Sequence, residues 1–361
     1  MSRIALIHRN YTTSGGTERY LVGFSRWLVA QGHEVHVLCH AIRDDLRADP
    51  GIRFHHLPML RPGRALKVLS LQIAVQQALA RLIREIPGGF DAILGLGRHT
   101  GHHLMRAGGG SHAAFLRRCH PWRRWISPTD WIEAAMDRRA LRSSRIVVAN
   151  SLLCAGDIRA DHPGVRVEVV YNGVDLRRFR PDPDQRIHVR REVGGADISQ
   201  SQPIALFLGT GFHRKGLDIA LAALPPGWAL WVVGEGRPLP APPGAQVRYL
   251  GPAREPERFL QAADALVLPT RYDPFANACL EAMACGIPAL TTPTNGVAEL
   301  LPEPWMIADT AQGFREALLR VGPGLGDRCR AISEQYTPER SFSRLLDLLL
   351  EAARLPPPER P

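Results

Sequence analysis

The chain has 361 residues, of which 45% are hydrophobic and 22% are charged, and its formal net charge at pH 7 is +10. This composition indicates a globular protein of two ordinary domains and excludes an intrinsically disordered chain. A charge or a proline interrupts the apolar runs before the ~20 residues of a membrane-spanning helix, and MSRIALIHRN lacks the features of a secretory signal.

The cysteines and the basic residues further restrict the class of protein and the partners to be expected. The six cysteines are scattered at positions 39, 119, 154, 279, 285 and 329 and form no CxxC pair, so we expect a reduced cytosolic protein. The histidines lack ligand spacing with these cysteines, so zinc is not expected. Lys67 and Lys215 are the only lysines among 45 basic residues. The positive charge favours anionic partners such as phosphates, nucleic acid or anionic lipid.

The first half of the chain begins with a β-α-β pattern. RIALIHR is a predicted buried strand, and a glycine turn leads into an amphipathic helix that ends at Gly32. EVHVLCH alternates as a second strand, so a parallel sheet with a right-handed crossover is expected. The later elements predicted in this half are a helix over 65–86 and strands over 91–97, 145–151 and 167–174.

The same pattern begins again after a proline-containing linker, DLRRFRPDPDQ. A helix is predicted over 217–224, and strands over 203–211, 229–236, 247–252, 265–269 and 288–292. The predicted fold class is α/β, with two Rossmann-like β/α/β domains facing across a cleft. The predicted divisions are an N-terminal domain 1–175 on the acceptor side, a linker 176–200, a C-terminal domain 201–335 that would bind the nucleotide-linked substrate, a helix 336–354 returning to the N-terminal domain, and a disordered tail 355–361.

Glycine turns after strands are the first candidates for ligand sites, because ligands of open α/β sheets bind beyond the carboxyl ends of the strands. Residues 14–18 form one such turn, SGGTE. Gly15 and Gly16 allow close approach of the backbone, and the following helix presents N–H groups that suit a phosphate. A plain tight turn is the alternative.

The second glycine turn, GTGFHRKG at 209–216, carries Arg214 next to Lys215. A planar guanidinium beside a compact ammonium suits a diphosphate. We expect an anion there because the pair is predicted at a helix start, which is already positive. A solvated basic pair is the alternative, and the turn is not a P-loop, because GxxxxGK[ST] is absent.

The stretch YDPFANACLE places Asp273 and Glu281 eight positions apart. Pro274 favours a loop before a helix over 275–284, which buries Glu281 among apolar neighbours. A buried carboxylate needs hydrogen-bond donors, and sugar hydroxyls are such donors. A sugar ring at Asp273 and a ribose at Glu281 would place a diphosphate between them. A helix cap at Asp273 with an internal salt bridge at Glu281 is an equal alternative.

Basic and aromatic side chains alternate in the segment 106–131. Its members are Arg117, Arg118, Trp122, Arg123, Arg124, Trp125 and Trp131. This combination suits an anionic membrane surface or a phosphorylated glycolipid, and it also suits single-stranded nucleic acid. Core tryptophans beside a solvated arginine face are the remaining alternative. His112 follows three glycines in the same segment.

Several of these motifs together resemble one family. DPFANACLEAMACGIP resembles the E-x7-E signature of family 4 (group 1) retaining glycosyltransferases, which have the GT-B fold. GGTER, GHEVHVL, ANS, VYNGVDLRRFRPD, VVGEG and ADALVLPT resemble other landmarks of that family in the same order. GTGFHRKG and the GGG before His112 are most similar to the lipopolysaccharide core glucosyltransferases.

The resemblance implies a role for each motif. Asp273 would contact hydroxyls of the donor sugar, Glu281 would hold the ribose, and Arg214 with Lys215 would bind the diphosphate. These four residues are the implied catalytic set. The implied donor-binding residues are Gly15, Gly16, Thr210, Arg214, Lys215, Asp273, Phe275, Ala276, Asn277 and Glu281. His112 would face the sugar. The chain departs from the family with Asp273 in place of the usual glutamate and Thr210 where many relatives carry arginine.

The implied reaction moves a hexose, with glucose expected, from a UDP-linked sugar to a glycolipid such as lipopolysaccharide core, with retention. No cofactor or metal is expected, and the DPD at 182–184 is interpreted as accidental. The expected location is the cytoplasm, peripheral on the inner membrane, with no nucleic-acid partner. The alternatives are a sugar-nucleotide epimerase or phosphorylase on the same fold, and a non-catalytic basic protein that binds nucleic acid or membrane. The nucleotide, hexose, acceptor and oligomeric state are not readable from the sequence.

Overall fold

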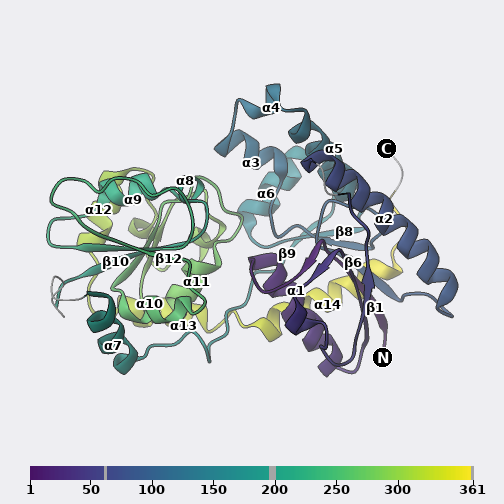
Figure 1. The fold of residues 1–361 in the computed structure, drawn as a ribbon, viewed down its shortest axis with the longest axis horizontal. Coiled ribbons are helices and arrows are strands. Elements are labelled where there is room, and N and C mark those ends of the chain that lie inside the picture. The colour runs from purple at the N-terminus through teal and green to yellow at the C-terminus, as the bar shows by residue number, and fades with distance from the viewer. Residues whose placement is uncertain (61–62, 195–200, 359–361) are drawn as a thin grey trace. The chain divides into compact units, whose positions relative to one another are not determined.

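A computed structural model describes residues 1–60, 63–194 and 201–358 and divides the chain into two compact units (Figure 1). The N-terminal unit contains Met1–Tyr171 together with Glu339–Pro361, and the C-terminal unit is Asn172–Pro338. Each unit is built on one large parallel sheet with helices, so the predicted α/β class with two Rossmann-like units is confirmed. Positions 195–200 of the predicted linker and 359–361 of the predicted tail lie outside the described residues.

The N-terminal unit is built on a seven-stranded sheet of order β5-β3-β1-β6-β7-β8-β9, in which every pair is parallel. The strands are β1 Arg3–Ile7, β3 Glu34–Cys39, β5 Ile52–His56, β6 Ala92–Gly95, β7 Leu104–Arg106, β8 Ile146–Ala149 and β9 Val167–Val169. The short strands β2 Asn10–Tyr11 and β4 Ala41–Ile42 pair separately. The sequence patterns missed β5 and β7, because polar side chains interrupt their apolar runs.

The helices of this unit cover both faces of its sheet. They are α1 Gly16–Ala30, α2 Arg64–Glu85, α3 His112–Cys119, α4 Arg123–Ile126, α5 Pro128–Ser143, α6 Leu152–Asp161 and α14 Pro338–Arg354, with a 3₁₀ turn η1 Asp44–Leu46. Alternate side chains of β1 enter opposite cores, because successive residues of a strand point to opposite faces. Ile4 and Leu6 pack with α1 and α14, whereas Ala5 and Ile7 pack with α2.

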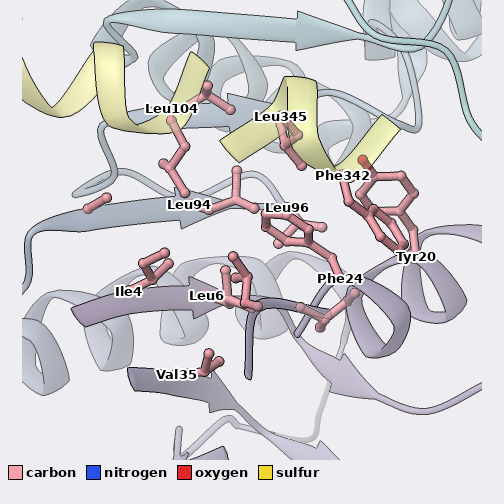
Figure 2. Close-up of a cluster of buried hydrophobic side chains, with 14 of the residues drawn as sticks. Ile4, Leu6, Tyr20, Phe24, Val35, Leu94, Leu96, Leu104, Phe342 and Leu345 are labelled. Carbon is pink, nitrogen blue, oxygen red and sulfur yellow. The ribbon is translucent and has the colours of Figure 1, made fainter. Parts of the chain in front are cut away.

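Helix α14 belongs to the N-terminal unit although it lies at the end of the chain. The Phe342 ring contacts Tyr20, with centroids 5.1 Å apart, and Phe24, at 5.5 Å. Figure 2 shows these rings beside Leu345 and beside Leu96, which directly follows β6. Aromatic contacts of this kind join α14 to α1, so the helix predicted over 336–354 completes the core of the first unit.

Helix α2 requires one correction to the sequence analysis. Its segment Ala65–Glu85 is long and apolar enough to cross a membrane by length and composition alone, contrary to the expectation of no such segment. Length and composition alone do not identify a membrane-spanning helix, because helices that cover a sheet in soluble proteins share them. Here Val75 and Leu79 are buried against the sheet, whereas Ile73 is 58% exposed.

The C-terminal unit has a five-stranded parallel sheet of order β12-β11-β10-β13-β14. The strands are β10 Ile204–Leu208, β11 Ala229–Val233, β12 Gln246–Gly251, β13 Ala265–Leu268 and β14 Ala289–Thr291. Its helices are α7 Pro183–Gly194, α8 Phe212–Lys215, α9 Leu217–Ala223, α10 Pro256–Ala262, α11 Asn277–Ala284, α12 Ala311–Leu319 and α13 Leu325–Ser333, with 3₁₀ turns η2 Gly296–Leu300 and η3 Pro304–Met306.

The predicted linker 176–200 is not a simple connector. Its residues 183–194 form α7, which is fixed to the C-terminal unit by two arginines that share one carboxylate. Arg186 and Arg190 each lie 2.6 Å from an oxygen of Asp264. The sequence did not reveal this helix, because most of its residues are polar and it has no clear amphipathic pattern. The ion pairs that fix it join residues far apart in the chain.

Both sheets have a switch point, where the strand order reverses direction. In the N-terminal unit it lies between β1 and β6, and in the C-terminal unit between β10 and β13. Ligands of open α/β sheets bind at the carboxyl ends of strands beside such points. The loops after these four strands therefore contain the candidate sites.

Candidate functional site

The loop after β10 brings two cations to the switch point of the C-terminal unit. Helix α8 is bounded by Gly211 and Gly216, both of which have positive φ angles, 80° and 77°. A Cβ at Gly216 would lie 1.9 Å from the carbonyl oxygen of Pro269, so only glycine allows this loop to approach the end of β13. The approach places Lys215, which is 8% exposed, next to the loop that follows β13.

Asp273, in that loop, is the direct partner of both cations. Lys215 Nζ lies 2.7 Å from Asp273 Oδ2, and an Nη atom of Arg214 lies 3.0 Å from the same oxygen. Burial alone would raise the pKa of Asp273, but the charges and hydrogen bonds of Lys215 and Arg214 outweigh burial and lower it. Asp273 is therefore an ionised, buried carboxylate at the β10/β13 switch point.

This geometry corrects the electrostatic argument made from the sequence. Arg214 and Lys215 end the four-residue helix α8 and directly precede Gly216, the N-cap of α9, so they do lie at the start of the predicted helix over 217–224. The positive charge at this position is compensated within the protein, because Asp273 pairs with both side chains. The need for an external anion therefore does not follow from their position, and diphosphate binding stays a prediction.

The segment after Asp273 is held by side chains instead of helical hydrogen bonds. The Phe275 N–H donates to Asp273 Oδ1 at 3.2 Å, and the Ala276 N–H donates to Asn295 Oδ1 at 3.1 Å. These bonds explain why α11 begins at Asn277, two residues later than predicted. Asn295, buried and at the start of η2, is a positioning residue that the sequence analysis missed, because nothing local distinguishes it.

Glu281 lies on α11 and is 8% exposed. Arg178 is close enough for the charge of Glu281 to contribute to the raised pKa of that arginine, although the main cause is a hydrogen bond to Glu257 at 2.8 Å. Glu281 is thus buried near a positive charge of its own unit. Its predicted contact with a ribose stays a prediction, as do the contacts predicted for Asn277 and for the exposed Thr210.

The N-terminal unit has a cavity of about 320 Å³ at its own switch point. Residues that follow β1, β6 and β7 line it, including His8, Arg98 and Gly108–Gly110. One wall is apolar and includes Leu71 of α2. The cavity therefore combines charged groups, glycine backbone and an apolar wall, which is the composition of a site for a small polar molecule.

The glycine turn predicted to approach a phosphate faces a carboxylate of its own helix. Gly15 caps α1, and a Cβ at Gly15 would lie 2.1 Å from Glu18 Oε2. His8 Nε2 is 3.5 Å from Glu18 Oε1. A hydrogen bond to His8 is the main cause of the lowered pKa of Glu18, and burial opposes it. Glu18 therefore complements the positive end of α1, and the phosphate contact predicted for Gly15 and Gly16 stays a prediction.

His112 lies in a buried ionic cluster and is not among the residues that line the cavity, and its predicted contact with a sugar stays a prediction. Its Nε2 is 3.3 Å from Asp130 and 3.8 Å from Glu133. Burial and the charge of Arg98 lower the pKa of His112. These three residues could hold a metal ion by geometry alone. However, Arg123 lies 2.8 Å from Asp130 and Arg98 2.7 Å from Glu133, so the carboxylates are already compensated.

The basic and aromatic segment separates into two parts. Arg117 is 2.6 Å from Asp161 and Arg118 is 2.5 Å from Asp157, so both arginines pair with α6. The aromatic residues are instead at the surface, with Trp122 80% and Trp125 67% exposed. The side chain of Arg124 lies outside the described residues. The alternative of core tryptophans is wrong for these positions.

Comparison with solved structures identifies the fold. The chain is similar to WaaG, a glycosyltransferase involved in lipopolysaccharide biosynthesis, with a TM-score of 0.77 over 96% of this chain and 99% of that one, at 19% identity. It is also similar to the Anabaena protein HepE in complex with UDP-glucose, with a TM-score of 0.71 over 97% and 100%, at 16% identity. The fold is therefore that of a GT-B glycosyltransferase.

Sequence comparison then identifies the family. Glycosyltransferase Family 4 matches residues 14–178, and Glycosyl transferases group 1 matches residues 202–321. A probable transglycosylase of Burkholderia thailandensis is 30% identical over 73% of this chain and 75% of its own length. A D-inositol 3-phosphate glycosyltransferase of Segniliparus rotundus is 29% identical, and the match spans 58% of this chain but only 45% of that relative. The chain belongs to the family 4, group 1 glycosyltransferases, as its motifs indicated.

Proposed function

We propose that this glycosyltransferase moves glucose from a UDP-linked donor to a hydroxyl of a cell-envelope glycolipid such as lipopolysaccharide core, with retention. The cluster of Lys215, Arg214 and Asp273 at the β10/β13 switch point carries the proposal. It puts two cations and one carboxylate where a nucleotide sugar would bind in an open α/β sheet. HepE was solved with UDP-glucose, and WaaG acts in lipopolysaccharide biosynthesis, which supports the donor and the acceptor class.

In the proposed reaction, the bond between the anomeric carbon and the diphosphate oxygen breaks while the acceptor oxygen bonds to the same face. The departing phosphate oxygen takes the acceptor proton. Lys215 and Arg214 stabilise the charge that develops on the diphosphate, which is electrostatic preorganisation. We propose that this charge is stabilised without a metal ion.

A donor panel tests this proposal. UDP and UDP-glucose are expected to raise the melting temperature of the protein, whereas GDP- and ADP-sugars raise it less, because binding to the folded state stabilises it by mass action. Release of UDP with a glycosylated lipid product, carrying the α-anomer, checks transfer and retention. Stabilisation by GDP or ADP alone would contradict the donor, and a free sugar phosphate or epimerised nucleotide as the product would contradict the reaction.

We also propose that the N-terminal unit binds the anionic inner-membrane surface from the cytoplasmic side. Trp122, Trp125 and Ile126 are 80%, 67% and 74% exposed on and beside α4, and Trp131 of α5 is 53% exposed. Figure 1 shows α4 at one end of its unit, beside α3 and α5. Exposed indole rings near basic residues favour the interface of an anionic bilayer.

Vesicle binding checks the role of these rings. A Trp122→Ser/Trp125→Ser double variant is expected to bind phosphatidylglycerol-containing vesicles at least about tenfold more weakly, because two exposed indoles no longer enter the interface. The matched control is Leu319→Ser, which removes a side chain that is 64% exposed on α12 of the other unit. Equal sedimentation of the double variant and the wild type would rule out this surface.

A further inference from the structure

The loop between β11 and β12 contains a short proline-rich segment, RPLPAPP at residues 237–243. Each residue of this segment either is a proline or directly precedes one. Proline fixes its own φ at about −65°, and the residue before a proline is restricted to extended or polyproline II conformations. The sequence of the segment therefore favours a polyproline II helix, in which three residues complete one turn.

The exposure of the side chains follows the same period of three. Leu239 and Pro242 are partly buried, whereas the other residues of the segment are exposed. Positions three apart lie on the same edge of a polyproline II helix. One edge therefore packs against the C-terminal unit, and the other two edges face solvent. The exposed edges carry Arg237, Pro240 and Pro243 on one side and Pro238 and Ala241 on the other.

The segment is held at its middle and at its end. The hydroxyl of Tyr249, on β12, accepts a hydrogen bond from the Leu239 N–H at 3.1 Å and donates one to the Leu239 carbonyl at 2.6 Å. At the end, the Ala245 N–H donates to the Pro242 carbonyl at 3.0 Å, and Gly244 has the positive φ, 76°, that a type II turn requires. These contacts fix the segment within its own unit, so a partner that binds it loses less free energy to ordering.

The exposed edges combine apolar rings with one cation. Pro238, Pro240 and Pro243 present their rings to solvent, and Arg237 is exposed at the N-terminal end of the segment. Within the described part of the chain, Arg237 forms no ion pair. Proline rings on a polyproline II helix suit a groove lined with aromatic side chains, and a guanidinium beside them suits carboxylates at one end of that groove.

We infer that residues 237–243 bind a partner protein whose groove is aromatic and of the SH3 type, with Arg237 against carboxylates at one end of the groove. Pro240 and Pro243 have the P-x-x-P spacing that such grooves recognise, and both lie on one exposed edge. The edge of Leu239 and Pro242, which packs on the protein, is not needed for this contact. The surface includes none of the residues to which we assign the transfer reaction.

Fluorescence anisotropy of a labelled SH3 domain, titrated with the full-length protein, measures this contact. The domain chosen is one that selects an arginine before the two prolines of its ligand. We expect saturable binding, and we expect a synthetic peptide of residues 236–244 to compete for the groove. A Pro240→Ala variant is expected to raise Kd at least about tenfold, because one pocket is left unfilled. An Arg237→Gln variant is expected to raise Kd about tenfold, because a charge-assisted contact is lost.

Three matched controls are expected to bind the domain as tightly as the wild type does. Pro226→Ala changes an exposed proline in another turn of the same unit, next to Gly227, whose φ is 83°. Arg320→Gln removes an exposed arginine at the end of α12. A chain that ends at Leu355 lacks the prolines of the tail LPPPERP, the other proline-rich stretch near an arginine.

Four outcomes would overturn the inference. The first is binding by the peptide without binding by the full-length protein, because the fold would then hide the segment. The second is an unchanged Kd in Pro240→Ala, and the third is loss of binding when the chain ends at Leu355, which would assign the contact to the tail. The fourth is no binding by either the peptide or the protein. The measurement requires neither nucleotide nor transfer, so its result does not depend on the proposed function.

Discussion

Replacing Lys215 by alanine is expected to lower kcat/KM by more than about tenfold, which corresponds to at least ~1.4 kcal/mol of transition-state stabilisation. Lys215 is the most buried cation at the β10/β13 switch point, and its stem packs along Gly209, where a Cβ would lie 3.2 Å from the lysine Cε. A buried ammonium that faces a departing diphosphate acts in a low dielectric, where its charge is most effective. Steady-state kinetics with UDP-glucose checks this.

The pattern of substitutions at this loop tests the assignment further. Lys215→Arg is not expected to restore activity, because a planar guanidinium cannot occupy the place of the compact ammonium beside Gly209. The matched control is Arg328→Ala, which removes an arginine that is 57% exposed and pairs with Glu303 in the same unit. Near-normal turnover of Lys215→Ala, or an equal loss in Arg328→Ala, would count against a catalytic role for Lys215.

Replacing Asp273 by asparagine is expected to destabilise the C-terminal unit by about 3 kcal/mol, near the lower end of the range for removing one partner of a buried ion pair. The substitution keeps the shape and the acceptor for the Phe275 N–H, but it leaves Lys215 and Arg214 without their carboxylate. The free energy of unfolding from urea titration is the measurement. Asp218→Asn is the control, because Asp218 pairs with Arg271 at the surface and its loss is expected to cost less than ~1 kcal/mol.

The difference in free energy of unfolding between the wild type and Asp273→Asn is expected to depend on pH, because the pKa of Asp273 is lowered in the folded protein. A carboxyl group whose pKa is lower in the folded state than in the unfolded state stabilises the fold fully at a pH above its unfolded pKa, which is about 3.9 for aspartate. That stabilisation is lost as the pH falls through the folded pKa. The wild type is therefore expected to lose its advantage over Asp273→Asn below about pH 4. A difference that is constant from neutral pH to strongly acidic pH would show that Asp273 is not the ionised partner of Lys215.

Most of the fold could be predicted from the sequence because its signals are local. The buried strands of both units appear as short apolar runs, and the helices between them as amphipathic patterns that end at glycine or proline. The elements that were missed depend on distant partners. Helix α7 has a polar pattern and is fixed by Asp264, and β7 has only three residues.

The residues of the candidate site could be predicted from local signals, but the contacts between them could not. The sequence indicated Arg214, Lys215, Asp273 and Glu281 by their positions after strands or in an apolar run. It could not show that the two cations share one carboxylate, because Lys215 and Asp273 are 58 positions apart. It also gave no sign of the buried cluster around His112, whose ring is enclosed by residues of α5.

The sequence by itself determined the α/β class, the two repeats of the strand-helix pattern and the glycosyltransferase family, since short runs of neighbouring residues encode each of these. Only the tertiary structure decided which charges compensate one another. That pairing gives Asp273 to Lys215 and Arg214, and it gives Glu133 and Asp137 to Arg98. Ion pairing depends on distances between side chains that the crossovers of a parallel sheet bring together, and no local pattern specifies those distances.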